Sequence, residues 1–324
     1  MKLKKEYLIL LLVIAALGAY LMMRSKDQTH FELPRLSEVE SNKINRLVIG
    51  KSDGTIELNK KDDQWTFGPK AYKADSIKVK NMLKAAVDLS ITALVSESEN
   101  YERYDLADDK KVRVQAFADK EILRDFAIGR QAPTSQHTFV RLADDPKVYH
   151  ARGNLHFTFD NTVDDLRDET VLAYEKSDIT GLTIAKGKQN LTLTKQEVLQ
   201  EKETPTDEKK EEQNPQTKIQ WMDSNGTVAR QAVVESLIND LSRLKCDDYL
   251  EDNARDGLQN PAWTVTLNSE NADHTLSVFK KASEESIEFP AVSSGTPYAF
   301  ILHKSRVEKF EKDIDRLLNP GEKQ

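Results

Sequence analysis

The sequence contains a single cysteine, Cys246, in 324 residues. One cysteine excludes a disulfide within the chain and any metal cluster made of several thiolates, and such a side chain is typically a small buried residue. The chain also lacks the Gly-x-Gly-x-x-Gly and Gly-x-x-x-x-Gly-Lys loops that hold nucleotide phosphates, and the Gly-x-Ser-x-Gly turn of hydrolases. We therefore expect no nucleotide and no cofactor.

Histidines and acidic residues are present, but not in the spacings that metal sites or catalytic sites require. The six histidines include no His-x-x-x-His or His-Glu-x-x-His pair, so no zinc site is predicted. The acidic pairs Asp108-Asp109, Asp144-Asp145 and Asp164-Asp165 fall at expected turns or on a polar helix face, where we interpret them as solvated acids. No catalytic and no metal-binding residue is predicted, and we expect a protein that is not an enzyme.

The charge distribution also argues against nucleic acids as partners. The chain has 47 Lys and Arg against 54 Asp and Glu, a formal net charge of −7, while its first 26 residues are basic. The remainder is therefore more acidic than the total suggests. Affinity for nucleic acids comes largely from neutralising phosphates with cations, so nucleic acid binding is not expected.

The longest uncharged run, from Tyr7 to Met23, indicates a membrane anchor. As a helix it would be about 25 Å long, close to the thickness of a bilayer core. Tyr7 and Tyr20 lie near its ends, where aromatic rings favour the interface, and we expect Leu12 and Met23 to contact lipid as well. Residues 1–26 are thus predicted to be an uncleaved signal anchor with its basic end in the cytoplasm. A cleaved signal peptide, with Ala16-Leu17-Gly18 as its best site, and a buried soluble helix are the alternatives.

Beyond a polar stalk (27–43), the sequence shows weak internal similarity. The segment Ile44–Ile49 matches Ile179–Ile184, and each copy continues with a hairpin turn, a strand containing a tryptophan (Trp65 or Trp221) and an amphipathic helix. The apolar stripes of the two helices are Val79, Met82, Leu83 and Ala86 in the first copy, and Val234, Leu237, Ile238 and Leu241 in the second.

This similarity predicts two tandem repeats, 44–172 and 173–319. Each copy is expected to close on a helix, through Phe159, Val163 and Leu166 in the first and Phe310, Ile314 and Leu317 in the second, with Ser305-x-x-Glu308 as a capping box. Residues 196–217 are rich in charge and poor in apolar side chains, so they are predicted to be a disordered insertion that interrupts a hairpin.

Short strands joined by turns outnumber helices in both copies. Asp53-Gly54 and Gly187 mark two-residue hairpin turns, and Asp144-Asp145-Pro146 marks another turn. Runs of this kind favour antiparallel over doubly wound parallel sheets. The predicted fold class is α+β: an N-terminal transmembrane helix followed by two tandem, duplicated, mostly antiparallel sheet-plus-helix domains.

Several short motifs resemble an uncharacterised bacterial domain-of-unknown-function family. They are Ala74-Asp75 before a helix, Tyr104-Asp105-Leu106, Phe126-x-Ile128-Gly129 and Val148-Tyr149, together with the anchor and the repeat. Members of that family are often encoded beside gliding-motility-type ABC transporter components. The resemblance implies a single-pass protein of the bacterial inner membrane whose C-terminal bulk is periplasmic. The second copy lacks clear Tyr-Asp-Leu and Phe-x-Ile-Gly elements.

These observations favour a non-enzymatic, membrane-anchored periplasmic interaction module, an accessory subunit of an ABC-type transporter or an envelope assembly. Its expected partners are the inner membrane and other membrane proteins. The alternative is an envelope glycan- or lipid-binding protein, or a hydrolase with an unidentified acidic site. Two polar loops, with Thr134 and His137 in the first copy and Thr296 and Tyr298 in the second, are predicted to lie at corresponding places and to bind the partner.

Overall fold

The computed structural model describes residues 10, 12–20, 32–199 and 217–321. Residues 10 and 12–20 of the predicted anchor are helical, with Leu12 and Tyr20 exposed, whereas Tyr7 and Met23 lie outside the described residues. Within the described part of the chain, no helix has the length and apolar character needed to cross a membrane.

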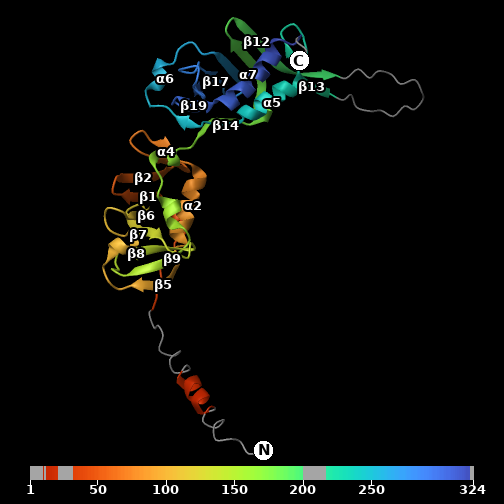
Figure 1. Cartoon of the computed structure of the whole chain (residues 1–324). Helices are drawn as coiled ribbons and strands as arrows, with labels where there is room; N and C mark the ends of the chain where they lie inside the picture. The colour runs from red at the N-terminus through yellow and green to blue at the C-terminus, as the bar shows by residue number, and fades with distance from the viewer. Residues whose placement is uncertain (1–9, 11, 21–31, 200–216, 322–324) are drawn as a thin grey trace, which may run out of the picture. The chain divides into compact units, whose positions relative to one another are not determined.

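The rest of the chain forms two compact units, each built on an antiparallel sheet (Figure 1). Unit 1 ends at Arg167 and unit 2 begins at Asp168. The predicted boundary at 172/173 differs because the strand Thr170–Ala173 pairs with a strand of unit 2. The mixed α+β class with mostly antiparallel sheets is confirmed.

Unit 1 contains a nine-stranded sheet in the order β4-β3-β2-β1-β6-β7-β8-β9-β5. Its strands are β1 Arg46–Lys51, β2 Gly54–Lys61, β3 Gln64–Phe67, β4 Tyr72–Lys73, β5 Ile91–Ser96, β6 Val112–Ala118, β7 Glu121–Gln131, β8 His137–Leu142 and β9 Val148–Arg152. Its helices are η1 Ser41–Lys43, α2 Ser76–Val87, η2 Tyr101–Tyr104, α3 Leu155–Phe159 and α4 Val163–Leu166.

Unit 2 contains an eight-stranded sheet, β13-β12-β11-β16-β17-β18-β19-β15, and a two-stranded one, β10-β14. The strands are β10 Thr170–Ala173, β11 Ile179–Lys186, β12 Gln189–Leu199, β13 Thr217–Asp223, β14 Arg243–Lys245, β15 Asp248–Tyr249, β16 Trp263–Ser269, β17 His274–Val278, β18 Glu288–Ser293 and β19 Phe300–His303. The helices are η3 Lys176–Asp178, α5 Gln231–Leu241, α6 Ala254–Gly257 and α7 Lys304–Leu318.

The large sheets of the two units share one strand order. When β4 is set aside, β3-β2-β1-β6-β7-β8-β9-β5 corresponds strand for strand to β13-β12-β11-β16-β17-β18-β19-β15. The first hairpin of each large sheet is closed by two residues, Ser52-Asp53 in unit 1 and Gly187-Lys188 in unit 2, at the turns that the sequence indicates. A helix, α2 or α5, follows the third or fourth strand of each unit.

Each unit has a core between its sheet and its helices. In unit 1, Val79, Met82 and Ala86 of α2 are buried against the sheet and Leu83 is partly buried; the four stripe residues of α5 are all buried in unit 2. Trp65 and Trp221 are buried core residues, and so is Cys246. The apolar stripes therefore lie on the buried faces of α2 and α5, as the sequence predicts.

The end of unit 1 differs from the single closing helix that the sequence predicts. Phe159 ends α3, and Val163 begins a separate helix, α4. Thr162 adopts an extended backbone and caps α4 in a capping box with Asp165, so the helical ladder restarts there. In unit 2 the closing helix α7 is continuous, but its N-cap is His303 rather than Ser305, because the His303 side chain accepts the Ser305 N–H.

Two predicted irregular segments are partly ordered. Leu33, Leu36 and Val39, in the predicted stalk, pack against the core of unit 1. The predicted insertion 196–217 begins later than expected, because β12 continues to Leu199 and pairs with β13 from Thr217. Residues 200–216 lie outside the described part of the chain.

Candidate functional site

The most exposed large apolar side chain in the described part of unit 1 is Phe157, at 83% exposure. It lies on α3, between Leu155 and Phe159, which are buried in the core of unit 1. Residues four apart share one helix face, so residue 157 must point away from the core. Phe126 and Phe159 contact each other edge to face, with ring centroids 6.0 Å apart, and this contact fixes the inner side of the helix.

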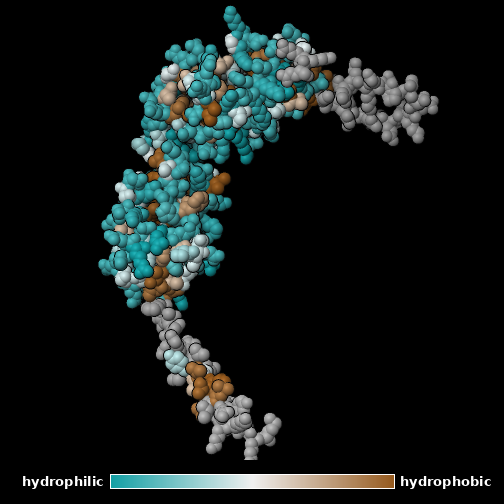
Figure 2. All heavy atoms as spheres, in the orientation of Figure 1, coloured by the Kyte–Doolittle hydropathy of each residue, from teal (hydrophilic) through white to brown (hydrophobic). Residues whose placement is uncertain are grey.

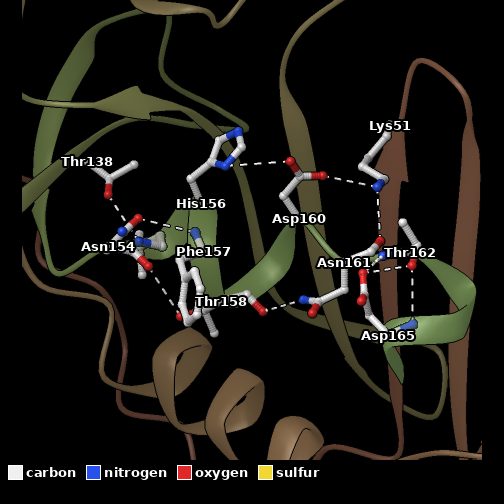
Figure 3. A network of polar contacts seen from close by, with 11 residues as sticks. Lys51, Thr138, Asn154, His156, Phe157, Thr158, Asp160, Asn161, Thr162 and Asp165 are labelled. Carbon is white, nitrogen blue, oxygen red and sulfur yellow. Dashed lines mark hydrogen bonds and ion pairs between the residues drawn. The ribbon is translucent and has the colours of Figure 1, made fainter. Parts of the chain in front are cut away.

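The start of α3 is held by two side-chain caps (Figure 3). The buried Thr138 hydroxyl in β8 donates to the Gly153 carbonyl at 2.7 Å and accepts the Leu155 N–H at 3.0 Å. The Asn154 side chain accepts the Phe157 N–H at 3.2 Å. The first turn of α3 is therefore attached to the sheet, and the backbone of Phe157 is fixed by its own cap.

The end of α3 is held by a charged network (Figure 3). The Lys51 ammonium, at the end of β1, lies 3.0 Å from the Asp160 carboxylate and donates to the Asn161 carbonyl at 2.9 Å. On its other side, Asp160 lies 3.6 Å from the His156 ring nitrogen Nδ1. Because the Lys51 side chain is only 16% exposed, this pair is better shielded from solvent than a typical surface pair.

The adjoining helix α4 is joined to α2. Thr162 donates to the Asp165 carboxylate through both its N–H and its hydroxyl, and these hydrogen bonds hold the pKa of Asp165 below its usual range. The Asp75 N–H donates to the Leu166 carbonyl at 2.8 Å, and Lys78 donates to the Asp165 carbonyl. The turn after α3 is thereby connected to the start of α2.

This arrangement exposes the Phe157 side chain on a helix, α3, whose two ends are held by hydrogen bonds and an ion pair. The visible face of unit 1 is mostly hydrophilic, with hydrophobic side chains in a few places (Figure 2). Ile77, at the start of α2, is the next most exposed large apolar residue of unit 1 among residues 32–167, at 68%. An exposed aromatic side chain on a fixed backbone is typical of residues that anchor a protein–protein interface.

The predicted loop of the first copy lies between β7 and β8. Thr134 is exposed, and its hydroxyl lies 3.1 Å from Nδ1 of His137. The His137 ring stacks on His150 of β9, with centroids 5.5 Å apart, and His150 also contacts Phe139 at 4.9 Å. Burial, with a smaller contribution from His137, lowers the pKa of His150. The structure thus places His137 in a ring cluster on the sheet rather than in the loop.

The predicted loop of the second copy lies between β18 and β19. Thr296 is only 9% exposed; its carbonyl accepts a hydrogen bond from Arg255 at 2.7 Å. Tyr298 is half-buried and contacts Tyr249 edge to face. These contacts build the loop itself, so Thr296 offers little surface to a partner.

The two loops do not correspond, contrary to the sequence-based prediction. In the shared strand order, the β18–β19 loop corresponds to the β8–β9 loop of unit 1, residues 143–147, whereas Thr134 lies in the β7–β8 loop. Successive loops of a meander lie at opposite ends of the strands, so Thr134 and Thr296 belong to opposite ends.

The β8–β9 loop contains one of the acidic pairs. Asp145 accepts hydrogen bonds from the Lys147 N–H and from the Tyr149 hydroxyl at 2.6 Å. Burial and this contact raise the pKa of Tyr149 to about 12. Among the described residues, no three His, Cys, Asp or Glu side chains are grouped closely enough to hold a metal ion.

One family profile, described as "Domain of unknown function (DUF4340)", matches residues 65–261, more than half of the chain. The chain belongs to the DUF4340 family. The resemblance to a domain-of-unknown-function family is confirmed at this level. The DUF4340 match begins within β3 and ends before β16, so it includes α2, α3 and both motifs around Tyr104 and Gly129. No curated protein and no solved structure gives a significant match.

Phe157 was not identified from the sequence. The signal that could have found it is the spacing of Leu155 and Phe159, which places residue 157 on the opposite side of one helical turn.

Proposed function

We propose that this protein is a non-enzymatic, membrane-anchored interaction module whose exposed Phe157 docks into an apolar pocket of a partner protein. The observation that carries the proposal is the exposure of Phe157 on a helix that Thr138, Asn154 and Lys51 hold in place. A helix whose backbone is already ordered loses little backbone conformational entropy on binding.

The neighbouring helix favours a partner with acidic residues around that pocket. α2 packs beside α3 and carries three lysines and no acidic residue between Ser76 and Val87. Lys84 pairs with Asp88 and Lys78 donates to the Asp165 carbonyl, so the exposed Lys80 is the lysine best placed to meet a partner. A partner surface with carboxylates would complement this helix and would steer the two proteins together.

In this proposal the segment from Tyr7 to Met23 anchors the chain in the bacterial inner membrane and the two units lie in the periplasm. The uncharged run and its basic flank support that topology. The partner is a subunit of an ABC-type transporter or of another envelope assembly. The shared strand order further supports an origin of both units by duplication.

Site-specific photocrosslinking in native membranes tests the docking residue. Benzoylphenylalanine replaces Phe157 in the full chain, and replaces Ile122, 51% exposed on the same unit, in the matched control. We expect crosslinks from position 157, and not from 122, to one transporter or envelope-assembly subunit, at an apolar pocket with nearby acidic residues. Lys80→Glu should weaken this crosslink, and a reversed charge on the partner should restore it.

Self-crosslinks alone, or the same products from positions 157 and 122, would contradict the docking role of Phe157. A C-terminal alkaline phosphatase fusion tests the topology separately. The fusion is active only if the C-terminal bulk is periplasmic, and an inactive but intact fusion would overturn that part of the proposal.

A further inference from the structure

Arg124 in β7 is the most deeply buried arginine among the described residues, with 6% of its surface exposed. It lies on the helix-covered face of the sheet with Phe126, two residues further along the strand. Its guanidinium donates to Ser37 in the segment 33–39, which we call the strap. The strap packs against the core of unit 1 through Leu33, Leu36 and Val39.

All hydrogen bonds of the Arg124 guanidinium within the described residues go to neutral oxygens. Nη2 donates to the Ser37 carbonyl, Nη1 donates to the Leu123 carbonyl at 2.8 Å, and a long contact of 3.4 Å joins Nη1 to the Ser37 hydroxyl. Nε is buried and has no partner there. The fork of donors that arginine offers to a carboxylate is therefore only partly used.

Four arginines of the described residues that are more exposed than Arg124 have a carboxylate partner: Arg46, Arg113, Arg306 and Arg316. Arg113, on the neighbouring strand and half exposed, forms a two-bond contact with Asp125 at 3.0 and 2.7 Å. The described part of the chain places no carboxylate within 4.0 Å of the Arg124 nitrogens. Burial lowers the pKa of Arg124, although a guanidinium stays charged. A buried cation without an anion is energetically costly, and an incoming anion would relieve that cost.

Two open hollows share Arg124 and residues of the strap in their linings. The larger, of about 700 Å³, has apolar walls from Leu36, Val39, Val87, Leu89 and Leu123; the other, of about 510 Å³, shares Leu36, Leu123 and Arg124 with it. Figure 2 shows hydrophobic atoms gathered at this end of unit 1, beside β5. The larger hollow has the size of a small-molecule site.

We infer that Arg124 and the larger hollow form a binding site for an aliphatic monocarboxylate, whose carboxylate meets Arg124 and whose hydrocarbon body packs on Leu36, Val39 and Leu89. The lining of this hollow also includes the acids Glu38, Glu40, Asp88 and Glu121, of which Glu40 is paired with Lys43. These acids repel a dianion such as phosphate more strongly than a single carboxylate. The carboxylate replaces the Ser37 hydroxyl, whose 3.4 Å contact with Nη1 is long, while the apolar body removes the leucine side chains from water.

Calorimetric titration of the full chain in lipid nanodiscs tests the inference, with empty nanodiscs as the blank. The probes are hexanoate, hexanol, acetate and inorganic phosphate. We expect saturable binding of hexanoate, at least tenfold weaker binding of acetate, which lacks the apolar body, and no binding of hexanol or phosphate. Binding of hexanol as tight as that of hexanoate would overturn the role of Arg124.

Two variants of Arg124 test whether it binds the ligand or only holds the strap in place. Arg124→Lys keeps the charge without the fork, and Arg124→Met removes both; each should weaken hexanoate binding at least tenfold. The matched control, Arg113→Met, removes an arginine that lies outside the hollow and should leave the affinity unchanged. If the unaltered chain fails to bind hexanoate, Arg124 only clamps the strap. The readout needs no partner protein, so it fails or succeeds independently of the Phe157 proposal.

Discussion

The backbone of Gly129 lies against the carbonyl oxygen of Tyr104: a Cβ on residue 129 would lie 2.1 Å from that oxygen and 3.0 Å from Cγ of Leu106. This close approach joins the two short motifs Tyr104-Asp105-Leu106 and Phe126-x-Ile128-Gly129. Tyr104 and Leu106 cover the second face of the sheet together with Phe139 and Val148. Only glycine at position 129 lets the η2 segment come so close to β7.

Gly129→Ala should therefore destabilise unit 1. The added methyl group displaces the Tyr104 carbonyl, and overpacking of this kind typically costs about 1–3 kcal/mol. The measurement is urea unfolding followed by circular dichroism. Gly50→Ala is the matched control, because a Cβ there meets nothing closer than the Thr55 hydroxyl at 3.9 Å. Equal stability of the two variants would contradict the packing argument.

Thr138→Val should destabilise the start of α3. Valine keeps the shape of the side chain but removes the hydrogen bonds to Gly153 and Leu155, leaving buried backbone groups unpaired. The expected loss is about 1–3 kcal/mol in the free energy of unfolding. Thr183→Val, whose hydroxyl makes only a 3.4 Å contact with Thr192, should lose much less. Hydrogen exchange of the Leu155 and Phe157 amides, faster only in Thr138→Val, locates the effect.

His150 should make the stability of unit 1 depend on pH. Burial lowers its pKa in the folded state, so the unfolded chain binds its proton first as the pH falls. The contribution of His150 to the free energy of unfolding is complete at neutral pH. It is lost as the pH falls from about 6.5, the ordinary pKa of histidine, to the lowered pKa of the folded state. Urea unfolding at pH 7.5 and pH 5 measures the decline. It should shrink in His150→Phe, and a decline of the same size would exclude His150 as its source.

Cys246 should react slowly with thiol reagents in the folded protein. It is 4% exposed, and its N–H donates to the Glu169 carbonyl at 2.8 Å, within the core of unit 2. We expect a maleimide to react at least tenfold more slowly in buffer than in concentrated urea. The reference is a Cys246→Ser/Ser283→Cys variant, whose exposed thiol should react at similar rates in both. Fast labelling of native Cys246 would show that this part of unit 2 opens readily.

Local patterns predict much of this fold because they depend on residues close in sequence. The turns at Asp53-Gly54 and Gly187 close hairpins, and the stripe beginning at Val79 marks the buried face of α2. The break between Phe159 and Val163 combines the local capping box of Thr162 with a contact from Lys51, which is distant in sequence and holds the turn after Asp160. An apolar stripe alone gives no sign of that contact.

The candidate sites were harder to predict, because burial decides them. Thr296 looks like a surface loop residue until Arg255 and its own turn cover it. Phe157 looks like a core residue until Leu155 and Phe159 occupy the inner face of α3. Arg124 looks like an ordinary polar strand residue, yet it is buried and donates to the strap at Ser37. In each case the residue that determines burial or exposure lies on another element or on the opposite helix face.

The contact between Lys51 and Asp160 joins residues 109 positions apart. A ribosome must therefore release nearly all of unit 1 before the first hairpin can meet the turn that ends α3. Contacts of such long sequence separation form late and slow the folding of a domain. Until then the part of the inner face of the sheet that Leu155 and Phe159 later cover stays accessible on the growing chain. This is the interval in which a chaperone would have the most to bind.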